Sequence, residues 1–448
     1  MPVNTPSSAY TESAPRVKRV RDCAEGQDAV KDAGTLYLPQ LSGQDDYEYD
    51  AYKNRGYVIP VVKPTASALT GAIMRKAPSS ELPENLEYLI ENSDGEGKDL
   101  SILASDSCSE LMLAGRYGYL GETLESGVAI KAYSRESIIN WSDDYIVLSQ
   151  NYMVQDPKDK FKQVSKVEYL ELTFDENGLY IQNIWREGNG KRYGIIDTKE
   201  PSINGTRLDK LPFEFINTMD ATPILTDPAL LHLSDVNLDQ YRLSTDLRHG
   251  LHWTALPTLF LFGEVTDSKG KQVKIAVGAG TSNHIQDSEA RVELLEFTGA
   301  GLSAISAAID EDIETMGSIG ARLLVGKSSG VKATETVKIE QSGETATLST
   351  IAQSVENGIT NILKTLAEWS GMSGDIVYSL NKDFIDATLS PQELSVYLQA
   401  LQSEAISQET FLNLLHRGEL LPKGISVEDE IALLDAGGSD FNDDTING

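Results

Sequence analysis

Three long helical patterns between residues 228 and 371 constrain this chain more than any other feature. Apolar residues recur there at spacings of three and four, first from Pro228 to Trp253, then from Leu302 to Leu324, and finally from Thr334 to Trp369. At 1.5 Å per residue the second helix would span roughly 34 Å. Each helix can bury only one stripe of its surface, so all three need partners from the rest of the chain or from other copies of it. Self-assembly is therefore the first functional inference.

Two segments interrupt these helices. Residues 257–298 contain strand-like runs around an Asp-Ser-Lys-Gly turn and predict a compact β insert. Residues 325–333 read Val-Gly-Lys-Ser-Ser-Gly-Val-Lys-Ala, and they predict a loop because glycine loses the most backbone entropy in a helix. Within the third helix, Gly343 and Gly358 lower the cost of bending, so we expect a kink there.

The flanking segments predict an α+β domain before the helices and a mostly helical segment after them. Helical patterns in the first segment cover residues 15–24, 47–57, 64–74 and 100–113, and strand-like runs cover 128–133, 145–154, 162–174, 179–185, 192–196 and 213–217. Asn177-Gly178 predicts a tight hairpin because this pair accepts positive φ. After residue 371 we expect a strand at 376–380, helices at 391–403, 407–415 and 427–434, and a disordered acidic tail at 437–448.

Composition narrows the class of protein. The chain has 448 residues and a formal net charge of -30, which argues against a protein that grips phosphate through Lys and Arg. Two cysteines, Cys23 and Cys108, cannot form a disulfide framework or a zinc site alone, and they suit a reducing cytoplasm. No signal-peptide pattern or membrane-length apolar run is present in the sequence. We expect a protein that works in water.

Catalytic and metal motifs are near misses. Residues 320–328, Gly-Ala-Arg-Leu-Leu-Val-Gly-Lys-Ser, resemble a phosphate-binding loop but have the wrong glycine spacing and follow a helix. His249 and His252 could be two metal ligands, although a hydrogen-bonded structural pair is favoured. The carboxylates at 310–312 and 314 could do acid/base work, but consecutive helical residues point about 100° apart and predict a solvated face instead. We therefore predict no enzyme, cofactor or metal site.

A basic cluster lies near the N-terminus. Residues 15–22 read Pro-Arg-Val-Lys-Arg-Val-Arg-Asp. This cluster could be a nucleic-acid patch, but the solvated face of a first helix is the favoured interpretation.

The order of these parts resembles that of the portal proteins of tailed double-stranded DNA bacteriophages. The resemblance covers nearly the whole chain and rests on local motifs at residues 14–22, 29–31, 37–39, 138–141, 211–213, 235–244, 295–297, 380–384 and 406–410. Each motif alone is weak evidence, and the resemblance depends on all of them occurring in this order.

The resemblance implies a ring, usually of twelve subunits, at one capsid vertex, through which the genome is pumped in and later ejected. It divides the chain into a wing (1–225), a first stem helix (226–256), a clip (257–298), a second stem helix (299–324), a tunnel loop (325–333), a long kinked helix that completes the wing (334–371), and a crown with an acidic tail (372–448). It places the protein in the virion, after assembly in the cytoplasm of a bacterial host. The implied partners are further copies of the chain, double-stranded DNA bound without sequence specificity, the terminase motor, a head-tail adaptor, and the major capsid and scaffolding proteins, with no membrane.

The same resemblance assigns candidate site residues. The tunnel loop is formed by Gly326, Lys327, Ser328, Ser329, Gly330, Val331 and Lys332. Channel-facing candidates on the second stem helix are Asp310, Glu311 and Glu314, and candidates for docking in the clip are Asp267, Lys269 and Lys271. Two lysines in a loop give contacts too weak to trap a passing duplex, and an acidic wall does not adhere to it.

Two other classes remain open. A capsid shell or scaffolding protein would form closed shells or rods. A nucleotide-dependent packaging enzyme would need a true phosphate-binding loop, which this sequence lacks.

Overall fold

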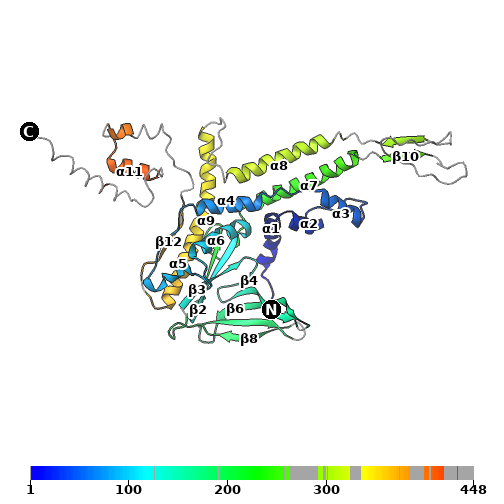
Figure 1. The fold of residues 1–448 in the computed structure, drawn as a ribbon. Helices are drawn as coiled ribbons and strands as arrows, with labels where there is room; N and C mark the ends of the chain where they lie inside the picture. Colours follow the sequence, from blue (N-terminus) through cyan, green and yellow to red (C-terminus); the bar gives the residue numbers. More distant parts are fainter. Residues whose placement is uncertain are drawn as a thin grey trace, which may run out of the picture. The chain divides into compact units, whose positions relative to one another are not determined.

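The computed structural model describes residues 2–125, 127–156, 158–188, 192–255, 258–262, 291–295, 299, 301–322, 334–372, 374–382, 398–402, 405–417 and 431 (Figure 1). The chain divides into two compact units. The first contains Met1–Val325 and Val331–Lys382, and the second contains Gly326–Gly330 and Asp383–Gly448.

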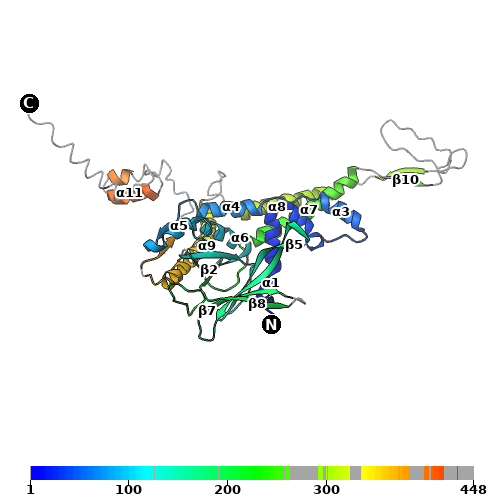
Figure 2. The same cartoon turned by 60° about the horizontal axis from the view of Figure 1, so that its bottom comes forward.

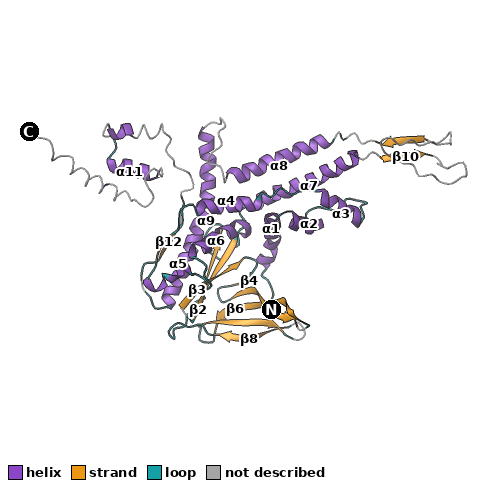
Figure 3. Ribbon diagram, viewed as in Figure 1, coloured by secondary structure: helices purple, strands orange, loops and turns teal. Residues whose placement is uncertain are grey.

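The first unit mixes helices and strands, which Figure 3 distinguishes by colour. Its helices are α1 (Ser8–Glu25), α2 (Gln27–Asp32), α3 (Asp46–Arg55), α4 (Val62–Ile73), α5 (Tyr88–Glu91), α6 (Leu100–Ala114), α7 (Leu231–Ala255), α8 (Leu302–Arg322) and α9 (Thr334–Trp369). Short 3-10 turns lie at Gly34–Leu36 and Glu84–Leu86. Its strands are β1 (Ser79–Glu81), β2 (Arg116–Leu124), β3 (Gly127–Ser134), β4 (Ile138–Trp141), β5 (Ile146–Asp156), β6 (Asp159–Phe174), β7 (Tyr180–Glu187), β8 (Tyr193–Lys199), β9 (Phe213–Asn217), β10 (Thr258–Phe262), β11 (Arg291–Leu295) and β12 (Val377–Ser379).

A three-stranded antiparallel sheet of order β3-β2-β9 forms the centre of this unit. Tyr119 of β2 is fully buried, and its hydroxyl donates a hydrogen bond to Ser107 Oγ of α6 over 2.7 Å. On the opposite side of β2, a Cβ atom on Gly118 would lie 3.0 Å from Ile138 Cδ1 of β4. The sheet therefore lies between helices and the second sheet, and burial of α9 residues such as Ile359 and Ile362 completes the core.

The second sheet has five antiparallel strands in the order β4-β5-β6-β7-β8. Ile146 and Leu148 of β5 pair with Leu172 and Leu170 of β6, and all four are buried. The two-residue period of a strand places these side chains on one face of the sheet, so this face belongs to the core. The hairpin between β6 and β7 has Gly178 at φ +74°, whereas Asn177 has no positive φ.

The sequence pattern predicted most of these elements. The three long helices match α7, α8 and α9 within a few residues, and the strand predicted at 213–217 is β9. The first helix was predicted to begin at Pro15, which is wrong. It begins at Ser8, because Ser7 caps it by accepting a hydrogen bond from the Tyr10 backbone N–H over 3.1 Å.

β2 was not predicted. Its two glycines weaken the strand signal, yet a side chain at either place would collide with the core. A Cβ atom on Gly118 would lie 2.4 Å from Phe213 Cζ, and one on Gly121 would lie 2.8 Å from Leu366 Cδ2. Glycine stands here because other parts of the chain approach the strand closely.

The strand predicted at 376–380 is β12, which pairs with β1 within the first unit. In the second unit, the structure describes α11 (Gln408–Arg417), which matches the helix predicted at 407–415, and helical residues at 398–402. Ser407 Oγ accepts a hydrogen bond from the Thr410 backbone N–H over 3.1 Å, as its cap-like pattern suggests. The helix predicted at 427–434, except residue 431, and the acidic tail at 437–448 lie outside the described residues.

Candidate functional site: the α7–α8 helical hairpin

The first half of α7 is fixed in the core of the first unit. Leu233, Leu238 and Tyr241 are at most 2% exposed. Asn237 Nδ2 donates a hydrogen bond to the Ile59 backbone oxygen over 2.9 Å. Gln240 Nε2 donates to the Tyr57 backbone oxygen, Gln240 Oε1 accepts from the Ile59 N–H, and Ser244 Oγ accepts from the Tyr57 N–H. The polar residues of the motif at 235–244 thus hold an extended segment of the chain against α7.

The basic cluster of α1 forms cross-links to other elements. Arg19 Nη1 lies 2.5 Å from Asp235 Oδ1 of α7, and Arg16 Nε lies 3.1 Å from Asp227 Oδ1. Lys18 pairs with Asp22 of its own helix over 2.8 Å. The helical prediction is confirmed, and Arg16 and Lys18 are exposed as expected of a solvated face, but the cations are also paired with carboxylates. Paired cations are also poor ligands for phosphate.

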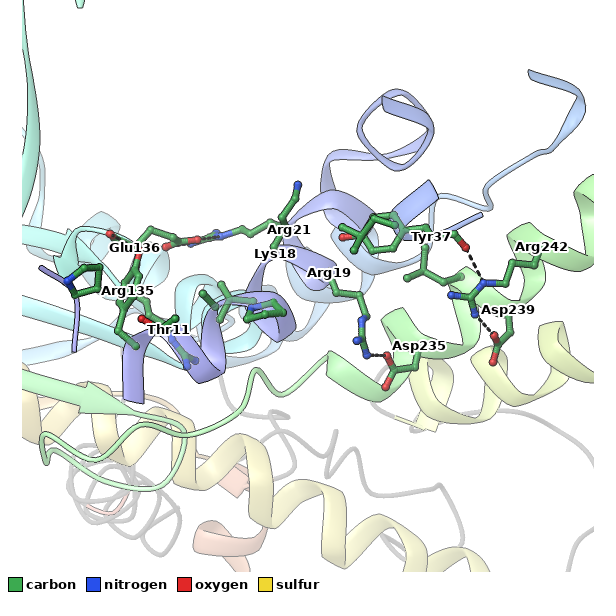
Figure 4. Close-up of a pocket in the computed structure, with 17 residues that line it drawn as sticks. Thr11, Lys18, Arg19, Arg21, Tyr37, Arg135, Glu136, Asp235, Asp239 and Arg242 are labelled. Carbon is green, nitrogen blue, oxygen red and sulfur yellow. Dashed lines mark hydrogen bonds and ion pairs between the residues drawn. The ribbon is translucent and has the colours of Figure 1, made fainter. Parts of the chain in front are cut away.

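Arg21 joins three elements. It reaches Glu110 of α6 at 2.5 Å and Glu136, just before β4, at 2.8 Å. Burial acts to raise the pKa of Glu136, but the hydrogen bonds and charge of Arg21 hold it below 4.5. The Arg21–Glu136 and Arg19–Asp235 pairs line a groove of about 990 Å³ between α1, the segment near Tyr37 and α7 (Figure 4).

Residues 251–253 at the end of α7 are exposed, and so are many of the described side chains of α8. α7 and α8 run side by side (Figure 2). A Cβ atom on Gly250 would lie 2.5 Å from Leu302 Cδ2, so glycine permits a close approach where α8 begins. Leu251 and Trp253 are each 48% exposed, and Met316 is the one buried residue among the described side chains of α8. This part of the hairpin therefore keeps exposed apolar surface at Leu251, Trp253 and Ile313.

α8 carries a run of carboxylates. Asp310, Glu311 and Glu314, the channel-facing candidates, are exposed. Asp312 turns toward α7, where burial and the charges of Asp239 and Glu311 raise its pKa. Its Oδ2 atom is buried without a hydrogen-bond partner among the described residues. The sequence pattern did not distinguish Asp312 from its neighbours, because the contact with α7 is tertiary.

The two histidines of α7 do not form a pair. His249 Nε2 accepts a hydrogen bond from Trp253 Nε1 over 3.0 Å, and its ring stacks edge-on against Tyr52 of α3 at 5.1 Å. Burial, together with the charges of Arg55 and His252, lowers the pKa of His249. The predicted structural role is correct for His249, but its partner is Trp253. Within the described residues, no group of three or more His, Cys, Asp or Glu side chains could hold a metal ion.

The other candidate residues lie beyond the described chain. This applies to the tunnel-loop residues 326–332 and to the clip residues 267, 269 and 271. At the base of the proposed clip, β10 and β11 pair antiparallel from Thr258↔Leu295 to Phe262↔Arg291. The element before the near-miss phosphate loop is a helix, α8, which rules out the strand that this motif requires. Among the described helices, none is long and apolar enough to span a membrane.

Comparisons with known proteins cover this hairpin. Residues 229–370, which include α7, β10, β11, α8 and α9, match a family described as "Domain of unknown function (DUF4055)". No curated protein matches the sequence.

Solved structures give distant likenesses. A chain of the virion of a native gene transfer agent particle matches 88% of this chain and 99% of its own length, at 13% identity and a TM-score of 0.40. A chain of the neck of an empty gene transfer agent particle, computed with C6 symmetry, matches 87% and 98%, at 14% identity and a TM-score of 0.38. Both TM-scores are low, so neither likeness identifies the fold of this chain.

Proposed function

We propose that this chain is the subunit of a portal ring. Copies of it surround a channel at one vertex of a capsid, and double-stranded DNA passes through this channel during packaging and ejection. The terminase motor and a head-tail adaptor dock on the ring, and the capsid and scaffolding proteins surround it. The chain itself has a structural role without catalysis.

The observation that carries the proposal is the α7–α8 hairpin. One half of α7 is held in the core by buried side chains such as Tyr241, and the other half contacts α3 and α8 and ends at exposed residues such as Trp253. β10 and β11 pair between the two helices in the sequence, and the long helix α9 follows α8. This order fits two stem helices, a clip and a helix that returns to the wing.

Side-by-side copies would supply the surface that one hairpin lacks. Trp253 on α7 and Ile313 on α8 are 48% and 44% exposed. Contact with a neighbouring copy would remove such side chains from water at about 25 cal/mol per Å². A ring gives every copy the same two neighbours, so no hairpin stays uncovered.

The charges of α8 suit a wall that does not adhere to DNA. Asp310, Glu311 and Glu314 are exposed, and in this proposal they face the channel and repel the phosphate backbone. Lys327 and Lys332 of the proposed tunnel loop would give the few weak phosphate contacts that guide the duplex.

Imaging of the purified full-length chain tests this proposal. We expect open rings of uniform symmetry by electron microscopy and a matching mass by mass photometry. A compact monomer without a central hole would contradict the proposal, and closed shells or rods would favour a capsid or scaffolding protein. ATP turnover by the purified chain would favour the packaging enzyme.

A matched pair of variants connects the ring to the hairpin. Ile313→Glu should reduce the ring fraction, because it places a charge on the exposed apolar surface of α8. Ile90→Glu, at a 39% exposed residue of α5, is the control and should leave the ring fraction unchanged. If the two substitutions reduce the ring fraction equally, the α7–α8 hairpin does not form the contact between copies.

A further inference from the structure

A two-stranded arm extends from the five-stranded sheet. We define the hairpin arm as residues 151–167 of β5 and β6. The first nine residues of β6, 159–167, are all exposed. β7 pairs with β6 only from Glu168 onward, so β5 is the only described strand that pairs with this part of β6. A two-stranded ribbon in water is marginally stable by itself, which suggests that another surface supports the arm.

The chemistry of the arm is cationic and aromatic. It carries four lysines and two aspartates in a chain whose net charge is -30. Phe161, near its tip, is 86% exposed, and Lys160 Nζ lies 4.9 Å from the centre of the Phe161 ring. The one described ion pair in the arm is Lys162–Asp156, at 3.8 Å. The arm therefore presents an uncovered ring together with an excess of two positive charges, four lysines against two aspartates.

The outer face of α3 is its chemical complement. Residues 45–50 read Asp-Asp-Tyr-Glu-Tyr-Asp. Tyr49 and Tyr52 turn inward and are buried, and the Tyr52 hydroxyl donates a hydrogen bond to Asp246 of α7. Tyr47 points outward and is 83% exposed, with exposed carboxylates on both sides of it in the sequence.

We infer that the hairpin arm of one copy docks on α3 of the next copy in the ring, with Phe161 against Tyr47 and the lysines of the arm against the carboxylates of α3. The two rings are exposed within a single chain, so they do not cover one another there. The contact joins two different surfaces, so copies add head to tail and close into a ring when the rotation permits. The inference rests on the proposed portal ring and names a contact that would build it.

Disulfide cross-linking between two variants that carry cysteine at different positions tests the contact directly. Phe161→Cys protein is mixed with Tyr47→Cys protein under mild oxidation, and non-reducing gels are read. The native Cys23 and Cys108 are buried, at 1% and 0% exposure, so they give little background. We expect a mixed disulfide far above the level that each variant gives alone. Phe161→Cys mixed with Met219→Cys, at a 70% exposed position, is the control, and equal cross-linking there would overturn the inference.

Charge reversal gives a second measurement. Lys160→Glu with Lys166→Glu should weaken association by about tenfold or more at low salt and reduce its dependence on salt. Adding Asp46→Lys and Asp50→Lys to the same chain should restore association, because the two surfaces are complementary again. Lys63→Glu with Lys199→Glu changes the net charge equally at exposed positions and should have no such effect. If the variant with all four substitutions does not regain association, the inference is overturned.

The outcomes separate the inference from the proposed function. Rings that form without the cross-link leave the portal proposal intact and overturn the arm contact. Cross-linked chains that never close into rings support the contact and contradict the portal ring. If Lys160→Glu with Lys166→Glu abolishes DNA binding in a gel shift but leaves assembly unchanged, the arm is a nucleic-acid element and the inference is wrong.

Discussion

Gly358 of α9 lies against Ile216 of β9 so closely that a Cβ atom on the glycine would be 2.2 Å from Ile216 Cγ2. The same atom would be 3.1 Å from Tyr119 Cε2 of β2. Glycine at this position lets the long helix pack directly on the three-stranded sheet. Close packing therefore explains Gly358, and α9 is one continuous helix from Thr334 to Trp369. The expected kink at Gly343 or Gly358 stays a prediction.

Gly358→Ala should destabilise the fold. The added methyl group would overlap side chains on two buried strands, and overpacking of this kind costs about 1 to 3 kcal/mol. Gly317→Ala is the control, because its Cβ would meet nothing within 4 Å, and alanine there should be neutral or stabilising by up to about 1 kcal/mol. Urea unfolding of both variants measures the difference, and equal midpoints would contradict the close contact.

Arg116→Met should leave the free energy of unfolding at pH 7 unchanged or raise it. The Arg116 side chain is fully buried between two rings: its Cζ atom lies 3.9 Å from the centre of the Trp141 ring and 4.2 Å from the centre of the Phe215 ring. None of its guanidinium nitrogens has a hydrogen-bond partner among the described residues. Removing a buried polar group that lacks hydrogen-bond partners can recover about 1 to 3 kcal/mol of its desolvation cost. Arg135→Met is the control, and it should destabilise, because Arg135 donates hydrogen bonds to two backbone oxygens.

The pH dependence of Arg116 has a definite sign. Burial and the charge of Arg135 lower its folded pKa to about 9, well below the ordinary value that arginine keeps in the unfolded chain. The unfolded chain therefore binds the proton more tightly. The cost of burying the charged guanidinium destabilises the fold fully below pH 9 and decreases as the pH rises above 9. Relative to Arg116→Met, the wild-type chain should gain stability between pH 8 and pH 10.5, by circular dichroism in urea. A constant difference would contradict this assignment.

Glu136→Gln should matter less as the solution becomes acidic. The folded pKa of Glu136 lies below 4.5, so its contribution is present above that pH and is lost as pH falls through the folded pKa. The Glu136 side chain is 43% exposed, and solvent screening limits the effect to about 1 kcal/mol or less. The stability difference between wild type and variant should be measurable at pH 7 and should shrink toward pH 3. A difference that grows in acid would exclude the Arg21 pair as its source.

Lys327→Glu with Lys332→Glu should leave ring assembly intact and impair genome packaging or retention. Both lysines belong to the proposed tunnel loop, where positive charge would touch the phosphate backbone. Packaged DNA per particle, measured by nuclease protection, checks the effect, and Lys63→Glu with Lys199→Glu is the control. Normal packaging by the loop variant would contradict a role of the proposed tunnel loop in DNA passage.

The sequence by itself determined the three long helices. Their apolar spacing extends over many turns, so α7, α8 and α9 follow from local periodicity with bounds that differ by a few residues at most. The sequence also favoured a structural role for His249, because no ligand set accompanies it. Such conclusions need only residues that are near one another in the chain.

Tertiary structure alone decided where distant residues meet. β2 was missed because Gly118 and Gly121 look unlike a strand until Phe213 and Leu366 are seen beside them. The carboxylate partners of the basic residues of α1, such as Asp235 for Arg19, could not be identified from the sequence around α1. These contacts join residues more than 80 positions apart, and no local pattern encodes such a pairing, because packing and charge neutralisation depend on the folded arrangement of the whole unit.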